Sequence, residues 1–135
     1  GNTAEMSEQN VKDFFSNDRF AVLAGVVIDE VGEGRATAHI DVEDRHLNAN
    51  GFCQGGAIFT LADTTLAVAV NTRELNAVSV EANILYINAV TKGRLEAEAI
   101  EVVNHHRLPS MDVTLRQNGQ VVAKMTSLCY RKSKK

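Results

Sequence analysis

Apolar and polar residues alternate with a period that changes along the chain. From Ala36 to Val42 every second residue is apolar, which is typical of a strand with one buried face. Residues 20–31 are rich in Val, Leu and Ile and predict a buried strand, and the turn signal Gly32-Glu33-Gly34 follows them. We therefore expect these two strands to form a hairpin.

The longest apolar run, residues 57–72, predicts a helix because its length and its Ala, Leu and Ile content favour a helix over a strand. Apolar side chains stand around nearly its whole circumference, so other structure must cover it. Residues 7–15 predict a shorter helix, with Ser7 as a possible N-cap and Val11, Phe14 and Phe15 on one face. The irregular segment 44–56, rich in Asn and Gly, leads into the long helix.

Four more strand-like runs follow the long helix, and they cover residues 77–88, 94–104, 110–117 and 120–130. Asn118-Gly119 between the last two is a strong signal for a two-residue hairpin. The order predicts one α+β domain over residues 1–135, in which a long antiparallel sheet curls around a central helix. A second copy of the chain is the simplest cover for the rest of that helix.

Composition supports a compact domain and excludes several classes. Of 135 residues, 44% are apolar, 23% are charged and one is proline, which excludes a disordered or low-complexity chain. The net charge of −3 argues against nucleic-acid binding by bulk charge. Residues 131–135 form a basic tail, for which solvation is the default and contact with phosphates the alternative.

Cysteine usage and hydropathy exclude further classes. Cys53 and Cys129 are too few for a disulfide scaffold and have no metal-ligand spacing. The run 57–70 is too short for a membrane span and contains Asp63, and the first residues lack the features of a cleavable signal. We expect a cytoplasmic protein without a metal or redox cofactor and with no nucleic-acid or membrane partner.

Asp63 is the most informative single residue. It is the only charged side chain between Gly55 and Thr72. Burial of an unpaired carboxylate costs several kcal/mol, so its presence needs a reason. One interpretation is structural, with a hydrogen bond to the neighbouring backbone or to Thr64 and Thr65. The other is chemical, because a carboxylate that faces a cleft can act as a general base or nucleophile.

Gly55 and Gly56 stand at the start of the same helix. The free N–H groups of a first turn stabilise an anion, although a Gly-Gly pair is also common in tight turns. Gly55 and Asp63 are eight residues apart, hence roughly 12 Å apart at about 1.5 Å per residue. One carbonyl cannot contact both groups of one helix, so a catalytic interpretation requires a dimer with two shared sites.

Other residues are weaker candidates. Cys53 lies just before the helix, where a thiolate nucleophile is conceivable, but the flanking motif offers no histidine as its base. The four histidines, His39, His46, His105 and His106, lack metal-ligand spacing, and we expect them to be exposed. Ser79 and Asn83 interrupt the apolar run of a strand and could face either a site or solvent.

Residues 48–63 resemble the signature of the hotdog-fold acyl-CoA thioesterases, in particular their phenylacetate-degradation, PaaI-like branch. The family pattern of Asn, Gly, a Gly-Gly pair and Leu-Ala-Asp stands here as Asn48, Gly51, Gly55-Gly56 and Leu61-Ala62-Asp63. Residues 78–86 are similar to the family's third-strand segment, and residues 17–20 resemble its usual lead-in. The likeness covers nearly the whole chain.

The resemblance implies a role for each matching residue. Asp63 would be the general base or nucleophile, with Ser79 beside it, and both would come from one subunit. The Gly55 N–H would polarise the thioester carbonyl, and Asn48 would place the carbonyl or the attacking water, both from the other subunit. Gln54 stands where the family usually has His, and glutamine forms hydrogen bonds but does not titrate near neutral pH.

The implied activity is hydrolysis of an acyl-CoA to a free acid and coenzyme A by a homodimer or a dimer of dimers. Gly56, Thr64, Asn83 and Arg107 are the candidate substrate-binding residues, with Arg107 or residues 132–135 near the nucleotide phosphates. Because Gln54 departs from the histidine of the family pattern, an alternative is a non-catalytic acyl-CoA-binding domain that senses or carries its ligand. A hotdog hydratase or dehydratase is a third option, but its expected His and acidic motif is missing.

Overall fold

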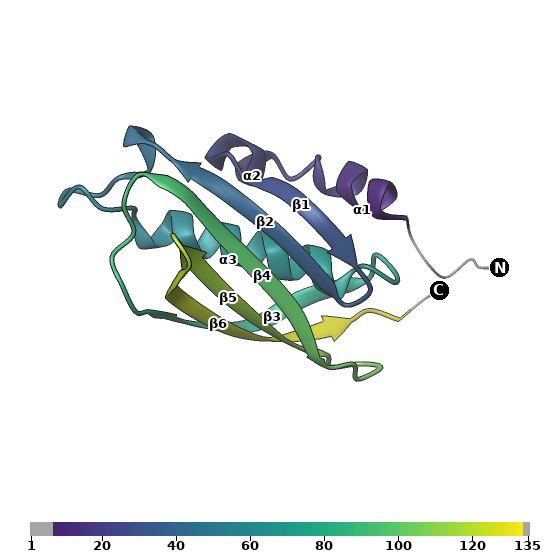
Figure 1. Cartoon of the computed structure of the whole chain (residues 1–135). Coiled ribbons are helices and arrows are strands. Elements are labelled where there is room, and N and C mark those ends of the chain that lie inside the picture. Colours follow the sequence, from purple (N-terminus) through teal and green to yellow (C-terminus); the bar gives the residue numbers. More distant parts are fainter. Residues whose placement is uncertain (1–6, 134–135) are drawn as a thin grey trace.

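A curled antiparallel sheet of six strands dominates the computed structural model, which describes residues 7–133 (Figure 1). The strands are β1 (Val27–Gly32), β2 (Arg35–Val42), β3 (Ala77–Tyr86), β4 (Gly93–Val103), β5 (Ser110–Gln117) and β6 (Gln120–Arg131). They lie in the order β1-β2-β4-β5-β6-β3, and every neighbouring pair is antiparallel. The predicted α+β architecture and the hairpin of the first two strands are confirmed.

Helix α3 (Gly55–Val70) crosses the hollow of this sheet (Figure 1). Leu61, Leu66 and Val68 of α3 are fully buried, and the helix packs against β2, β4 and β5. Burial of such side chains contributes about 1.5–3 kcal/mol each, which anchors the helix in the sheet. The helix begins two residues before the predicted range of 57–72, so Gly55 and Gly56 belong to its first turn.

The prediction of one strand over residues 20–31 is wrong for its first part. Residues Arg19–Ala24 form helix α2, and only Val27–Gly32 form β1. The Asp18 carboxylate caps α2 by accepting a hydrogen bond from the Ala21 N–H at 3.1 Å. Gly25 ends the helix in the left-handed region, with φ of 92°, which glycine adopts at low cost.

Helix α1 (Glu8–Phe15) confirms the predicted N-terminal helix. The Ser7 hydroxyl accepts from the Asn10 N–H at 3.0 Å, as expected of an N-cap. Val11 is fully buried, whereas Phe14 is half exposed, so only part of the predicted apolar face meets the core. Helices α1 and α2 lie along β1, at one edge of the sheet (Figure 1).

Strand β3 forms the other edge of the sheet and pairs with β6 alone. Four of its large apolar side chains are exposed in the single chain: Val78, Val80, Leu85 and Tyr86. An edge strand of ten residues with exposed apolar side chains presents unpaired backbone groups that another strand can cover. The turn between β5 and β6 has positive φ at Asn118 (53°) and Gly119 (79°), which confirms the predicted two-residue hairpin.

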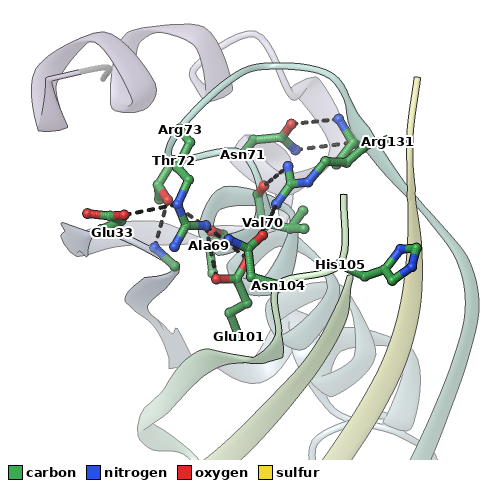
Figure 2. A network of polar contacts seen from close by, with 12 residues as sticks. Glu33, Ala69, Val70, Asn71, Thr72, Arg73, Glu101, Asn104, His105 and Arg131 are labelled. Carbon is green, nitrogen blue, oxygen red and sulfur yellow. Dashed lines mark hydrogen bonds and ion pairs between the residues drawn. The ribbon is translucent and has the colours of Figure 1, made fainter. Parts of the chain in front are cut away.

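A polar network closes the C-terminal end of α3 (Figure 2). Arg131 donates to the Val70 carbonyl at 3.1 Å and to Glu101 and Asn104 at 3.3 Å each. The expectation that the basic tail is solvated is therefore wrong for Arg131, which is only 9% exposed. It is buried because the last turn of α3 needs donors for its free carbonyls and favours a cation. Lys132 and Ser133 are exposed, and residues 134–135 lie outside the described residues.

Candidate active site

Asp63 lies on the side of α3 that the sheet leaves open. Within residues 7–133 its carboxylate accepts no hydrogen bond and forms no ion pair. Thr64 and Thr65 donate instead to carbonyls one turn earlier, at 2.8 and 2.6 Å. The structural interpretation of Asp63, in which these threonines or the backbone bind it, is therefore not what the structure shows.

The surroundings of Asp63 raise the pKa of its carboxyl group above the ordinary value. The main cause is partial burial, which disfavours the charged form, and the negative charge of Asp18 adds to it. A carboxylate with a raised pKa is a stronger base in its ionised form. This combination of an open position and raised basicity is typical of a reactive group.

Asp63 and Ser79 line the same groove, which we call the Asp63 groove. It has a volume of about 630 Å³ and runs between α3, α1 and the first half of β3. Its walls are mainly apolar and include Phe14, Phe15, Phe59, Leu75, Val78 and Val80. The structure thus brings together the two residues that the resemblance assigned to one subunit.

Hydrogen bonds orient the Ser79 hydroxyl within this groove. Its Oγ lies 2.8 Å from the Ser127 Oγ, and Ser127 in turn donates to the Glu81 carbonyl at 2.7 Å. Because the Ser127 proton is used in that bond, Ser79 is the donor to Ser127. The Ser79 oxygen keeps lone pairs that can accept a hydrogen bond from a water beside Asp63.

Gly55 and Gly56 present free amides at the start of α3. Among the residues that the structure describes, neither N–H has a hydrogen-bond acceptor. The first-turn amides that are bonded belong to Ala57 and Ile58, which donate to the Gln54 carbonyl at 3.0 and 3.3 Å. Two bare amides at the positive end of a 16-residue helix can stabilise an oxyanion.

Gln54 precedes this turn, but its side chain forms no cap hydrogen bond. Its Oε1 folds over Gly56, where it would lie 2.9 Å from an added Cβ. Gln54 and Gly56 line a second groove of about 540 Å³, the Gln54 groove, together with Phe20 and Leu23 of α2. This groove lies on the α2 side of α3 and does not include Asp63.

The two halves of the candidate site are therefore separated within one chain. Eight helical residues place Asp63 roughly 12 Å along the axis from Gly55 and about 80° around it. Asp63 and Ser79 lie in one groove, and Gln54 and Gly56 lie in the other. One substrate carbonyl cannot reach both in a single chain.

Asn48 organises the loop before α3. Its Oδ1 accepts hydrogen bonds from the Asn50 N–H at 2.9 Å and the Phe52 N–H at 3.1 Å. Its backbone N–H donates to the Phe52 carbonyl at 2.7 Å, which closes the loop. The carboxamide oxygen is thus engaged, and only the Nδ2 donor is left to contact a substrate.

Three predicted substrate-binding residues lie outside both grooves. Thr64 is buried on the α1 side of α3 and donates to Thr60. Asn83 alternates with the inward-packed Ala82 and Ile84, so it points away from the core. Arg107 donates to the Arg131 carbonyl at 2.9 Å and to Ser133 at 3.1 Å, which engages it in holding the end of β6.

The expectation of exposed histidines is wrong for two of the four. His39 is buried and pairs with Asp29 at 2.8 Å, and His46 is buried and bonds the Ala24 carbonyl at 2.7 Å. Each ring therefore interacts with a polar group of the same chain. His105 and His106 are exposed, and across residues 7–133 no three His, Cys, Asp or Glu side chains are arranged to hold a metal ion.

Cys53 is a poor nucleophile in this structure. It is 5% exposed, and burial raises the pKa of its thiol to about 11. The thiol is therefore protonated at neutral pH, and it donates to the Gln54 carbonyl at 3.7 Å. In the described part of the chain, no helix has the length and apolar content that crossing a membrane requires.

Sequence reasoning missed two residues near the site. Asp18 acts on the pKa of Asp63, and no local sequence pattern connects these two residues. Tyr86 donates its hydroxyl to the Gly55 carbonyl at 3.0 Å, across 31 residues of sequence. No local pattern indicates such a contact, because the sheet topology brings the end of β3 to the start of α3.

Known proteins share both the sequence and this architecture. The model of the thioesterase superfamily matches residues 50–124. An Archaeoglobus fulgidus protein is 40% identical over 104 residues, which cover 74% of this chain and 68% of the relative. The acyl-coenzyme A thioesterase PaaI of Escherichia coli is 38% identical over 71 residues, which cover 53% of this chain and 51% of that protein.

Solved structures extend the likeness to nearly the whole fold. The structure of the E. coli PaaI protein superposes with a TM-score of 0.88 at 29% identity, over 93% of this chain and 92% of that one. A Streptococcus mutans protein bound to acetyl CoA superposes with a TM-score of 0.75 at 27% identity, over 82% and 91%. The sheet curled around α3 is the hotdog fold, and the chain belongs to the thioesterase superfamily.

Proposed function

We propose that this protein is an acyl-CoA thioesterase whose active site is shared between two subunits. The observation that carries the proposal is the division of the site. The unpaired Asp63 carboxylate and the bare Gly55 and Gly56 amides lie on one helix but cannot meet at one bond within a chain. The acyl-CoA thioesterase name of the E. coli relative and the acetyl CoA bound to the S. mutans protein support the substrate class.

The edge strand β3 supplies a way to join the two halves. The start of β3 contributes Ser79 to the Asp63 groove, while the end of β3 contributes Tyr86, which contacts Gly55. When two copies of β3 pair antiparallel about a two-fold axis, the start of one strand lies beside the end of the other. Each Asp63 then faces the partner's Gly55, and the dimer has two equivalent sites.

This pairing also covers the exposed apolar side chains of β3. Leu85 is 62% exposed in the single chain, although apolar side chains of this size are normally buried. A second strand would satisfy the free backbone groups of the edge and remove Leu85 and its neighbours from water. The pairing that would cover the exposed edge strand would therefore also bring the two halves of the site together.

The chemistry follows from the two half-sites. The thioester carbonyl oxygen accepts hydrogen bonds from the helix-start amides, which stabilise the negative charge that develops on it. Asp63 of the other subunit takes a proton from a water that attacks the carbonyl carbon, or attacks the carbon itself. The C–S bond then breaks, and the sulfur is protonated to give coenzyme A. On the water route the acyl group leaves as the free acid. On the direct route it stays on Asp63 as a mixed anhydride, which a water molecule hydrolyses to the free acid and the restored carboxylate.

Gln54 contributes hydrogen bonding but no proton in the neutral pH range. Its carboxamide borders Gly56, so it is positioned to contact the carbonyl or the leaving sulfur. Because a coenzyme A thiolate is a good leaving group in water, a titrating acid is not required for the C–S bond to break. The activity of the wild-type protein tests this point directly.

The experiment is thiol release from a panel of acyl-CoA esters that spans short, long and aromatic acyl groups. We expect turnover by the wild type and a loss of about 10³-fold or more in kcat for Asp63→Asn, since this removes the base or nucleophile. Thr64→Val, one position along the same helix, is the matched control and should keep most of the activity.

Binding of an acyl-CoA without turnover, unchanged by Asp63→Ala, would contradict the proposal and favour the carrier or sensor alternative. Sedimentation of the same samples measures the oligomeric state. A strictly monomeric protein that still releases thiol would contradict the shared site, because each chain alone would then be sufficient.

A further inference from the structure

Tyr86 connects the edge strand to the first turn of α3. It is the last residue of β3, and its hydroxyl donates to the Gly55 carbonyl at 3.0 Å. The side chain is 52% exposed, so one side of its ring contacts the helix and the other is open. Burial on the helix side raises the pKa of the phenol, which keeps the hydroxyl protonated as a donor.

The ring also explains why residue 55 has no side chain. A Cβ on Gly55 would lie 3.1 Å from the Tyr86 Cζ and 3.2 Å from its Oη. Such distances are shorter than ordinary van der Waals contact, so an alanine would displace the ring or the helix start. The φ of Gly55 is not in the positive range, so backbone strain does not require glycine here. The tight contact comes from Tyr86 of the same chain.

The hydrogen bond acts on the peptide group that joins Gly55 to Gly56. Its oxygen is the Gly55 carbonyl, and its N–H is the bare Gly56 amide. A donor on the oxygen polarises the peptide group and strengthens its N–H as a donor. The same contact holds the first turn in place, so the amide is oriented before a substrate arrives.

We propose that Tyr86 is a positioning residue that holds the first turn of α3 in place and polarises the Gly56 amide toward the substrate carbonyl. This inference rests on the proposed thioesterase function and adds to it a residue that does not touch the reacting atoms. Because β3 is also the strand proposed to pair with its partner copy, Tyr86 links formation of the interface to the geometry of the amide site. Positioning of this kind affects the transition state more than substrate binding.

The first test is Tyr86→Phe, which keeps the ring and removes only the hydroxyl. We expect kcat to fall about three- to tenfold, the range for loss of one indirect hydrogen bond, with KM within about twofold of the wild type. Tyr130→Phe on β6 is the matched control and should leave both constants unchanged. An unchanged kcat in Tyr86→Phe, or a loss that is entirely in KM, would overturn the catalytic part of the inference.

The second test needs no activity and uses thermal unfolding of Gly55→Ala, Tyr86→Ala and the double variant. If the ring sets the requirement for glycine, Gly55→Ala lowers Tm in the Tyr86 background and costs less or nothing in the Tyr86→Ala background. An equal cost in both backgrounds would overturn the contact itself.

The two tests also separate this inference from the function on which it rests. A wild-type protein that releases no thiol from any acyl-CoA would overturn the proposed function and, with it, the catalytic role of Tyr86. The unfolding cycle would still show whether Tyr86 sets the conformation of the helix start.

Discussion

The two ends of α3 are built in opposite ways. At the C-terminal end, the Val70 carbonyl accepts from Arg131, and the Asn71 carboxamide bonds both the Ala67 carbonyl and the Ala77 N–H. At the N-terminal end, the Gly55 and Gly56 amides have no acceptor among residues 7–133. One end is closed by the protein, and the other keeps free N–H groups among the described residues.

The two ends also differ in how the protein treats the charge of the helix dipole. Figure 2 shows that Arg73 and Arg131 converge on Glu101, so two cations stand at the negative end of the helix dipole. The equivalent neutralisation at the positive end would be an anionic cap, but Gln54 is neutral and forms no cap bond. The positive end is therefore available to charge that develops during a reaction.

The largest effect on stability should come from opening the closed end. Arg131→Met removes a buried cation, so that the Val70 carbonyl loses its donor and Glu101 loses one of two partners. We expect the free energy of unfolding, measured by urea denaturation, to fall by about 2–4 kcal/mol, because the polar groups left behind stay buried.

Arg35→Met is the matched control, because Arg35 pairs with Glu98 at 3.0 Å on the exposed face of the sheet. Its loss should cost less than about 1 kcal/mol. Equal losses in the two variants would show that the closed end is not a special source of stability.

Most of the fold could be predicted from the sequence because apolar residues recur with a different period in the strands and in the helix. The alternation in residues 35–42 and the continuous apolar run before Thr72 specify their elements locally. Helix α2 was missed because the run Arg19–Ala24 is apolar enough for a buried strand. The residues that cap α2, Asp18 and Gly25, are of the types that favour the two ends of a helix.

The candidate site could be predicted only where the signal is local. Asp63 stands out because it is a lone charge in an apolar run, and Gly55-Gly56 because the pair opens a helix. Tyr86 and Arg131 each contact a segment that is distant in the sequence, and this contact sets the role of each residue. Such roles follow from the strand order rather than from spacing.

A smaller effect should come from closing the open end. Gln54→Asp places a carboxylate at the N-cap, where it can accept from the bare amides and complement the dipole. We expect a gain of about 1 kcal/mol in the free energy of unfolding and a loss of at least about tenfold in kcat/KM, since the cap competes with the substrate oxygen. Gln54→Ala adds no cap and is the control. A stabilised variant with full activity would show that these amides do not bind the carbonyl.

The smallest effect concerns the charge near Asp63. Hydrolysis needs the ionised carboxylate, so kcat/KM falls as the pH drops through the pKa of Asp63. Burial and the negative charge of Asp18 both raise that pKa, which moves the acid limb of the profile to higher pH than an ordinary aspartate would give. Removal of the Asp18 charge should therefore shift the limb to lower pH.

Asp18→Asn makes this change without loss of the α2 cap, because the asparagine oxygen can still accept from the Ala21 N–H. Burial remains the larger cause, so the limb should move only part of the way to the position of an ordinary carboxyl group. Asp41→Asn, which removes an exposed carboxylate on β2 outside the Asp63 groove, is the charge-matched control. A limb that stays in place in Asp18→Asn, or that moves equally in both variants, would assign the acid limb to a group other than Asp63.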